Sequence, residues 1–240
     1  VMQIAARHGV AVLPASGRTG LTGGLMTVGG LILSVERMNT IRQINPAARL
    51  AIVEAGVVLD SLHKAAEAED LYFPLWFGAR GSAMIGGVLS TNAGGSNVLR
   101  YGSTRALCLG LEVVTAQGDV WHGLTGLRKD NTGYDLRDLY IGSEGTLGII
   151  TAATLKLYPQ PAAQLTTWAA VASVEAAVQL LGLAQRELGA GLTGFEMMGQ
   201  FALSLVDKHF PEMQVPLWRE HAYCVLLENT DSESQEHARE

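Results

Sequence analysis

The sequence reads Pro14-Ala-Ser-Gly-Arg-Thr-Gly-Leu-Thr-Gly-Gly24 directly after an apolar run, Val10 to Leu13, that is expected to form a strand. Glycines fall at Gly17, Gly20 and Gly23. Backbone N–H groups in such a loop can surround an anion, and serine and threonine hydroxyls add donors. The GxxGxxG spacing fits neither a Rossmann GxGxxG loop nor a Walker loop. Taken alone, the motif leaves a pyrophosphate site and a glycine-rich surface turn both open.

Two further segments are also rich in glycine and in small polar residues. Gly142-Ser-Glu-Gly-Thr-Leu-Gly148 has the same GxxGxxG spacing at the entry to another expected strand. Between the two loops, the chain from Gly78 to Ser96 consists largely of glycine, small residues and hydroxyl or amide side chains. Such a surface suits a long, flat ligand with many polar edges, because small residues allow close approach of the backbone. A tightly packed interior helix and turn is the alternative, although it does not explain the polar side chains of Thr91, Asn92 and Ser96.

Composition excludes several classes of partner and site. The chain has 240 residues, a net charge of -6 and a sequence pI near 5.5, so no basic face indicates a nucleic-acid partner. Cys108 and Cys224 lack CxxC spacing, and no HExxH pair occurs, so neither a disulfide framework nor a metal site is expected. Two isolated cysteines favour a reducing, cytoplasmic location, with a place at the inner membrane or in mitochondria left open.

The hydrophobic pattern predicts two domains. Strands are expected at 31–35, 50–54, 109–115, 120–122 and 147–158, with helices at 1–8 and 59–70. Pro159-Gln-Pro161 marks the predicted boundary, which gives domains of 1–161 and 162–240. The second is expected to run strand, helix, helix, strand over 165–171, 174–188, 195–206 and 222–228, with a further helix starting in 231–240. We expect the first domain to be incomplete at its N-terminus and the second at its C-terminus.

Five motifs in order carry a resemblance to a known family: Pro14–Gly24, Gly78–Gly95, Arg100–Gly102, Leu127–Leu136 and Gly142–Thr151. They resemble the FAD-binding domain of the vanillyl-alcohol oxidase and p-cresol methylhydroxylase (PCMH) type, in the D-2-hydroxyacid dehydrogenase branch. That branch includes the glycolate oxidase D subunit, D-lactate dehydrogenase and D-2-hydroxyglutarate dehydrogenase. The resemblance implies an α+β fold in which two α+β subdomains sandwich FAD, followed by the start of a ferredoxin-like α+β cap domain.

The resemblance also implies which residues bind FAD. The first loop would wrap the pyrophosphate through Ser16, Gly17, Arg18, Thr19, Gly20 and Leu21, with Gly23 completing the motif. The middle segment would line the adenosine, phosphate and flavin edges through Pro74, Leu75, Gly81, Ser82, Gly86, Gly87, Thr91, Asn92, Ala93 and Gly95. Tyr101 and Gly102 would lie near the isoalloxazine, and the second loop would close the site through Glu144, Gly145, Gly148 and Ile149.

Members that attach FAD covalently often carry a histidine in the first loop, where this chain has Arg18. Arginine cannot form that bond, so we expect non-covalent FAD. The polar cluster from Lys129 to Asp135 lies in a family motif and could approach the flavin. For Asp130 we favour a role as a cap of a helix start, and the role of Lys129 stays open.

The activity implied by the resemblance is oxidation of a D-2-hydroxy acid to the 2-oxo acid, with hydride transfer to flavin N5. D-lactate, D-2-hydroxyglutarate and glycolate are all open, with a leaning towards the first two. The family's catalytic base, carboxylate-binding arginine and histidine-rich metal or base site are expected beyond Glu240, so no catalytic residue is assigned here. A quinone, an electron-transfer flavoprotein or a cytochrome would accept the electrons, and a homodimer is compatible with the sequence.

Two other functions are open on the sequence. The chain could be a non-catalytic FAD-binding subunit of a larger electron-transfer complex, because no catalytic group is visible in it. A glycine-rich site for ATP or NAD is disfavoured by the loop spacing.

Overall fold

Residues 1–239 are described by a computed structural model, in which the chain divides into two units. The first unit consists of Val1–Gly95 and Gly102–Gln160, and the second consists of Ser96–Tyr101 together with the chain from Pro161 onwards. The sequence-based boundary at 161/162 stays a prediction for the domains. The hydrophobic pattern of the sequence did not predict that six residues from the middle of the chain belong to the second unit.

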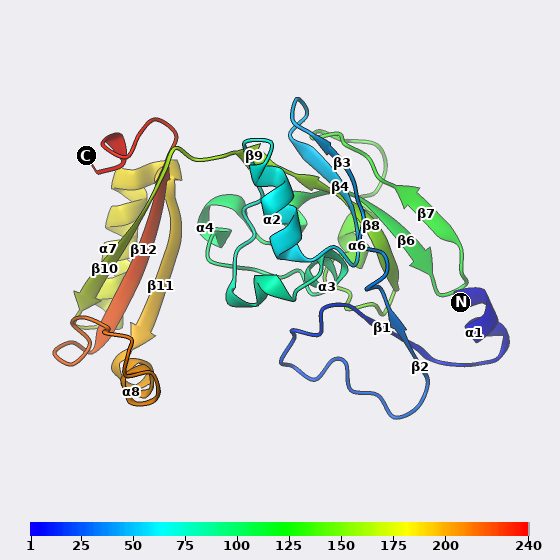
Figure 1. The fold of residues 1–240 in the computed structure, drawn as a ribbon, viewed down its shortest axis with the longest axis horizontal. Coiled ribbons are helices and arrows are strands. Elements are labelled where there is room, and N and C mark those ends of the chain that lie inside the picture. The colour runs from blue at the N-terminus through cyan, green and yellow to red at the C-terminus, as the bar shows by residue number, and fades with distance from the viewer. Residues whose placement is uncertain (240) are drawn as a thin grey trace. The chain divides into compact units, whose positions relative to one another are not determined.

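An antiparallel five-stranded sheet forms the centre of the first unit, in the order β3-β4-β8-β6-β7 (Figure 1). Its strands are β3 (Ile41–Asn45), β4 (Leu50–Glu54), β6 (Cys108–Thr115), β7 (Val120–Gly123) and β8 (Gly148–Lys156). The middle strand β8 is buried along nearly its whole length, so its sequence, GIITAATLK, is a run of small and apolar residues without alternation. This pattern is typical of a strand that is covered on both faces.

Short elements surround this sheet. Strands β1 (Val12–Ala15) and β2 (Leu31–Ser34) form a parallel pair, and β5 (Leu71–Tyr72) pairs with β9 (Tyr158–Pro159). The helices are α1 (Met2–Arg7), α2 (Leu59–Glu67), α3 (Ile85–Ser90), α5 (Thr104–Leu107) and α6 (Arg137–Tyr140), with a 3-10 turn at Gly78–Gly81. Helix α2 buries Leu59, Leu62 and Ala66 on one face, which is the spacing of an amphipathic helix.

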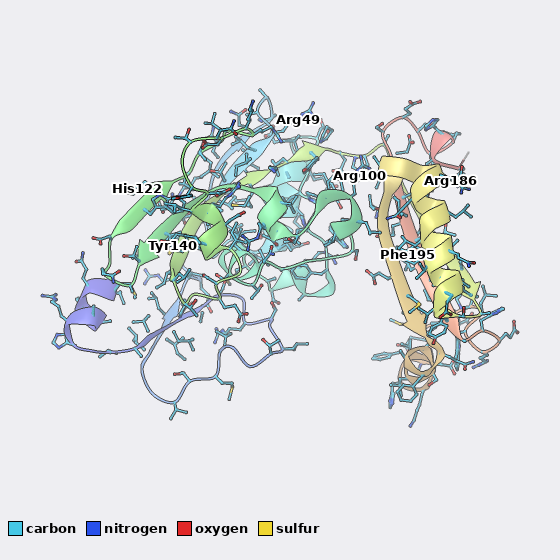
Figure 2. The ribbon with its side chains drawn as sticks, turned by 180° about the vertical axis from the view of Figure 1, so that it is seen from behind. Arg49, Arg100, His122, Tyr140, Arg186 and Phe195 are labelled. Atoms are coloured by element: carbon cyan, nitrogen blue, oxygen red, sulfur yellow. The ribbon has the colours of Figure 1, made fainter. Side chains whose placement is uncertain are left out.

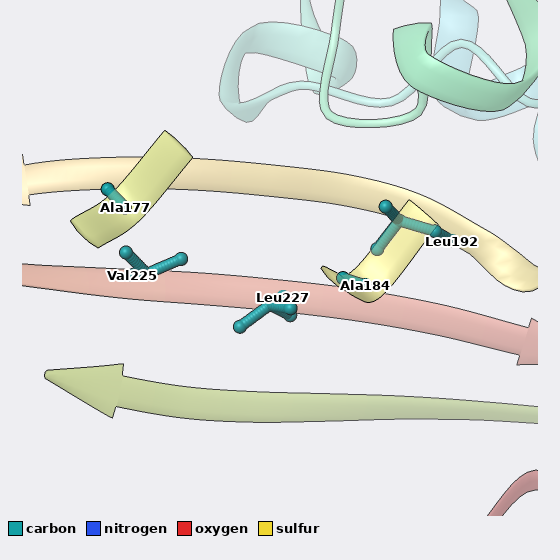
Figure 3. Packing of buried hydrophobic residues seen from close by; sticks show 5 residues of the cluster. All are labelled: Ala177, Ala184, Leu192, Val225 and Leu227. Atoms are coloured by element: carbon teal, nitrogen blue, oxygen red, sulfur yellow. The ribbon is translucent and has the colours of Figure 1, made fainter. Parts of the chain in front are cut away.

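The second unit is a three-stranded antiparallel sheet in the order β10-β12-β11, covered by a long helix. Its elements are β10 (Ala163–Val171), α7 (Val174–Leu188), β11 (Leu192–Gly199), α8 (Gln200–His209) and β12 (Tyr223–Asp231), with 3-10 turns at Gly189–Gly191 and His237–Arg239. Ala177 and Ala184 of α7 pack against Leu192, Val225 and Leu227 of the sheet (Figure 3). Because β12 lies between β10 and β11, the unit is a split βαβ arrangement of the kind found in ferredoxin-like folds.

One sequence-based element was wrong. The chain over 195–206 was expected to be mainly helical, but β11 runs to Gly199 and only then does α8 begin. Met197, Met198 and Glu196 have good helix propensity, yet Phe195–Gly199 pairs residue by residue with β12, and this tertiary pairing overrides the local preference. The unit therefore runs strand, helix, strand, helix, strand. The helix expected to start in 231–240 is a 3-10 turn at His237–Arg239 within the described residues.

The six residues Ser96–Tyr101 contain α4 (Val98–Tyr101), which packs on β11. Arg100, which is labelled in Figure 2, donates a hydrogen bond from Nη1 to Thr230 Oγ1 at 2.5 Å. A Cβ added to Gly194 would lie 3.2 Å from the carbonyl oxygen of Ser96, so the segment passes close to β11. No helix among residues 1–239 is long and apolar enough to span a membrane.

We expect the stability of the first unit to fall at alkaline pH through Cys108. Burial raises the pKa of this thiol from 9.0 to about 12. Between these values the unfolded chain loses the proton while the folded chain keeps it, so the free energy of unfolding should fall as pH rises from about 9 to 12. The measurement is urea unfolding across this range. The free energy of unfolding of Cys108→Ala should fall less steeply with pH, because the variant has no thiol at this position. Parallel pH profiles of the two proteins would contradict the prediction.

Candidate functional site

A cavity of about 330 Å³ lies in the first unit, where the three glycine-containing segments meet. The end of β1 and the loop that follows form one wall, α3 and the residues before it form a second, and the loop that enters β8 forms a third. The predicted residues that line this cavity are Ser16, Gly17, Arg18, Thr19, Gly20, Gly86, Gly87, Thr91, Ala93, Glu144, Gly145, Gly148 and Ile149. The sequence motifs therefore describe one site, although they are separated by more than a hundred positions.

The first loop lies directly against the chain that leads into α3. A Cβ on Gly17 would collide with the carbonyl oxygen of Ser82 and would lie 2.9 Å from Ala83 Cα, so only glycine allows this approach. Gly87 N donates a hydrogen bond to Ser16 Oγ at 3.1 Å, which joins the loop to α3. Arg18 has a φ of 53°, a left-handed conformation that is costly for a residue other than glycine and is concentrated at binding loops.

The second loop is fixed to the other end of α3. The backbone N–H groups of Gly142 and Glu144 donate to the carbonyl oxygens of Leu89 and Ser90, at 3.1 and 2.9 Å. Gly145 has a φ of 79°, and a Cβ there would lie 2.5 Å from Cγ of Pro14. The loop thus needs glycine for its conformation and for its contact with β1.

Arg105 holds the second loop from outside the cavity. Its guanidinium donates to the carbonyl oxygens of Asp138 and Ile141, at 2.7 and 2.5 Å, and also pairs with the Asp138 carboxylate at 3.2 Å. The side chain therefore fixes the end of α6 directly before Gly142. Nothing in the sequence pattern distinguished Arg105 from other surface arginines, because its partners are backbone carbonyl groups that only the fold brings near.

The other predicted cofactor-binding residues lie outside the cavity lining: Leu21, Gly23, Pro74, Leu75, Gly81, Ser82, Asn92, Gly95, Tyr101 and Gly102. Several have clear structural surroundings instead. Leu75 is a core residue, and a Cβ on Gly95 would collide with the carbonyl oxygen of Trp76. Leu21 is fully exposed, and Tyr101 belongs to the second unit. Contacts of these ten residues with a cofactor stay predictions.

Asn92 has a structural role at the end of α3. Its φ is 47°, and its Oδ1 accepts hydrogen bonds from Ser103 Oγ at 2.8 Å and from Arg105 N at 2.9 Å. The side chain thereby joins the C-terminus of α3 to the start of α5. Asparagine is one of the few residues that adopts the left-handed conformation at low cost, which explains the residue type without a ligand.

We expect Asn92→Ala to lower the free energy of unfolding by about 1–3 kcal/mol, because the two donors lose their acceptor. Asn92→Gly is the matched control, since it removes the same hydrogen bonds but tolerates the positive φ. It should therefore be destabilised less, and chemical denaturation measures both. A loss of FAD affinity without a loss of stability would assign the side chain to the cofactor and contradict this role.

Sequence reasoning missed the apolar side of the cavity. Phe77, Met84 and Val88 line it, together with Leu25 at the far end of the first loop. Phe77, Met84 and Val88 are large apolar residues within or next to a stretch of small ones, but Trp76, Ile85 and Leu89 share this pattern and do not line the cavity, so the sequence alone does not single out the three. A cavity with backbone donors on one side and apolar walls on the other suits a ligand that has an anionic part and flat aromatic parts.

The polar cluster at 129–135 does not line the cavity. Asp130 Oδ1 accepts from Thr132 N at 3.0 Å, which is a local turn contact. The next helix, α6, begins only at Arg137, so the expected role of Asp130 as a helix cap is wrong. Tyr134 is almost completely exposed. Residues 1–239 contain no group of three or more histidine, cysteine, aspartate or glutamate side chains that could hold a metal ion. Within the described part of the chain, the cavity can bind and orient a ligand, but no acid–base pair is placed in it.

Comparison with known proteins gives the context of this cavity. Residues 1–123 match a family described as "FAD binding domain". The chain is 40% identical over 227 residues to D-2-hydroxyglutarate dehydrogenase, mitochondrial, of Rattus norvegicus, covering 94% of this chain and 42% of that protein. It is 41% identical over 229 residues to D-2-hydroxyglutarate dehydrogenase of Xanthomonas citri, covering 95% of this chain and 48% of that protein.

A transhydrogenase and a solved structure extend these similarities. The chain is 36% identical over 224 residues to D-2-hydroxyglutarate–pyruvate transhydrogenase of Saccharomyces cerevisiae, covering 93% of this chain and 45% of that protein. An alkyldihydroxyacetonephosphate synthase structure superimposes with a TM-score of 0.77 at 20% identity, covering 97% of this chain and 44% of that one. The chain spans less than half of the length of each of these proteins.

Proposed function

Since this chain belongs to the FAD binding domain family, we propose that the protein is an FAD-dependent dehydrogenase that oxidises a D-2-hydroxy acid to the 2-oxo acid. The proposal rests above all on one observation. The residues that build the cavity lie in a chain about 40% identical to proteins named D-2-hydroxyglutarate dehydrogenase. Among the acids that the sequence left open, these names favour D-2-hydroxyglutarate over D-lactate and glycolate.

The residues of the cavity fit FAD. Gly17, Gly20 and Ser16 offer backbone and hydroxyl donors at one side, as a pyrophosphate requires, while Phe77 and Met84 offer apolar surface to a flat ring. When bound, FAD would supply a flavin ring that accepts hydride from the α-carbon of the substrate. The described residues of the chain would bind and orient it, and would exclude water from its phosphate groups.

Non-covalent attachment of FAD follows from Arg18 at the histidine position of the first loop. Acid precipitation of the flavin-loaded protein should leave the yellow colour in the supernatant. Colour that stays in the pellet would show a covalent bond and would overturn this part of the proposal.

A non-catalytic FAD-binding subunit is the second candidate, and one observation favours it. The described residues that line the cavity include no histidine or lysine, and Glu144 is their only carboxylate, so no acid–base pair is present. A quinone, an electron-transfer flavoprotein or a cytochrome as electron acceptor, a homodimer, and the compartment all stay predictions. The Rattus norvegicus and Bos taurus relatives are described as mitochondrial.

The deciding experiment is an anaerobic absorbance titration of the full-length native protein. Bleaching of the flavin bands by D-2-hydroxyglutarate, and not by the L-enantiomer, would support the dehydrogenase and its substrate together. Bleaching by D-lactate or glycolate alone would keep the reaction but change the substrate. Flavin bands that no 2-hydroxy acid bleaches, but that dithionite does, would favour the subunit. No flavin bands after addition of FAD would overturn both.

A further inference from the structure

Arg18 stands out electrostatically among the residues that line the cavity. It is the only lysine, arginine or histidine in the described lining, and Glu144 is the only acid. The pyrophosphate of FAD is doubly negative, whereas the other donors of the lining are neutral backbone and hydroxyl groups. A hydrogen bond from a charged donor to phosphate is about twice as strong as one from a neutral donor. Arg18 is therefore the side chain best suited to offset the charge of the cofactor.

This guanidinium already has a partner outside the cavity. Arg18 Nη2 lies 2.7 Å from Glu36 Oε1, and the two side chains are 65% and 47% exposed. Glu36 does not line the cavity, although its neighbour Val35 does. Ion pairs between such exposed side chains contribute little, because water competes for both groups. Arg18 can thus leave Glu36 for a more highly charged anion with little loss of interaction free energy.

The parallel pairing of β1 and β2 brings these two residues together. Ala15 lies opposite Ser34 in the register, and Val35 N donates to the carbonyl oxygen of Ala15 at 3.0 Å. Because parallel strands end at the same edge, the loop after β1 and the residues after β2 leave the pair side by side. Glu36 N donates to Ser34 Oγ at 3.2 Å, which fixes the backbone of Glu36 at this edge.

We propose that Arg18 exchanges Glu36 for the pyrophosphate of FAD when the cofactor binds, so that Glu36 sets the FAD affinity by competing for the guanidinium. The left-handed backbone of Arg18, at a φ of 53°, supports this role, since such conformations persist mainly where function requires them. The inference rests on the proposed FAD binding and adds to it a residue that weakens the cofactor complex. In this proposal the Arg18 side chain acts in addition to the backbone N–H groups of the loop, which would bind phosphate with any residue at this position.

The experiment measures the dissociation constant for FAD, by flavin fluorescence, of the full-length protein and three variants. We expect Arg18→Gln to weaken FAD binding about tenfold or more, because a charge-assisted hydrogen bond is lost. We expect Glu36→Gln to tighten it about threefold, because the competitor is removed. In the double variant, Glu36→Gln should have no further effect, because Glu36 acts only through Arg18.

Displacement of FAD by adenosine, which lacks phosphate, distinguishes the loss of the Arg18 charge from a distortion of the loop. The dissociation constant for adenosine should be the same in all four proteins. Equal FAD affinity in Arg18→Gln and the unaltered chain would overturn the exchange while leaving FAD binding intact. A parallel loss of adenosine and FAD affinity would also overturn it, since the loop itself would then be altered. No FAD binding by the unaltered full-length protein would overturn the proposed function as well.

Discussion

Replacing Gly17 with alanine should lower both the stability of the first unit and its affinity for FAD. The new Cβ would occupy the space of the Ser82 carbonyl oxygen and would come within 3.0 Å of Met84 N. All the close atoms belong to the backbone, so no side chain can move aside, and the loop must shift away from α3. Overpacking of this kind costs about 1–3 kcal/mol of unfolding free energy. The shift also moves the phosphate donors, so FAD affinity should fall at least about tenfold.

Gly20→Ala is the matched control for this prediction. Gly20 lines the same cavity from the same loop, yet no atom lies within 4 Å of the position that its Cβ would take. Thermal unfolding of the cofactor-free proteins should therefore show a lower midpoint for Gly17→Ala and an unchanged one for Gly20→Ala. Equal midpoints for the two variants would mean that the close packing at Gly17 is not required.

Phe73→Ala should lower the free energy of unfolding more than Gly17→Ala does. Phe73 is fully buried, at 0% exposure, in the segment between β5 and the 3-10 turn that precedes α3. Truncation of a buried phenylalanine typically costs about 3–5 kcal/mol, because the lost transfer free energy adds to the cost of the cavity. The variant should unfold at a clearly lower denaturant concentration in urea titration.

Phe77→Ala provides the comparison within the same segment. Phe77 lines the cavity and is only partly buried, so its truncation should cost much less stability but weaken FAD binding through lost apolar contact. Together the two variants separate the core side of the segment from its cavity side. The prediction is wrong if Phe77→Ala is as unstable as Phe73→Ala.

Much of the site was predictable from sequence because it is built from backbone. Close backbone contacts and positive φ values require glycine, as at Gly17 and Gly145. Such glycines can be recognised in the sequence without knowledge of the fold. The α+β class and the FAD-binding family were predicted and are confirmed. What could not be predicted depends on contacts across the chain. Arg105 acts through distant carbonyl groups, and β11 becomes a strand only through pairing with β12.

The same limit applies to Asn92. Its residue type and its place in a family motif predict a cofactor contact, which stays a prediction, while the structure adds that its oxygen accepts from Ser103 and Arg105. A motif records that a residue type is needed at a position, but it does not distinguish a ligand contact from a turn that shapes the ligand's surroundings. Only the positions of the neighbouring donors make that distinction.

The short segment Ser96–Tyr101 has a consequence for protein engineering. Because it lies on β11 while the residues on both sides of it belong to the first unit, neither unit is a continuous stretch of chain. A chimaera that exchanges the second unit at Gln160 would therefore place the native hexapeptide against a foreign strand, and Arg100 would lose Thr230. A working transplant must therefore carry both pieces, although the sheet of the second unit begins about sixty residues after the hexapeptide.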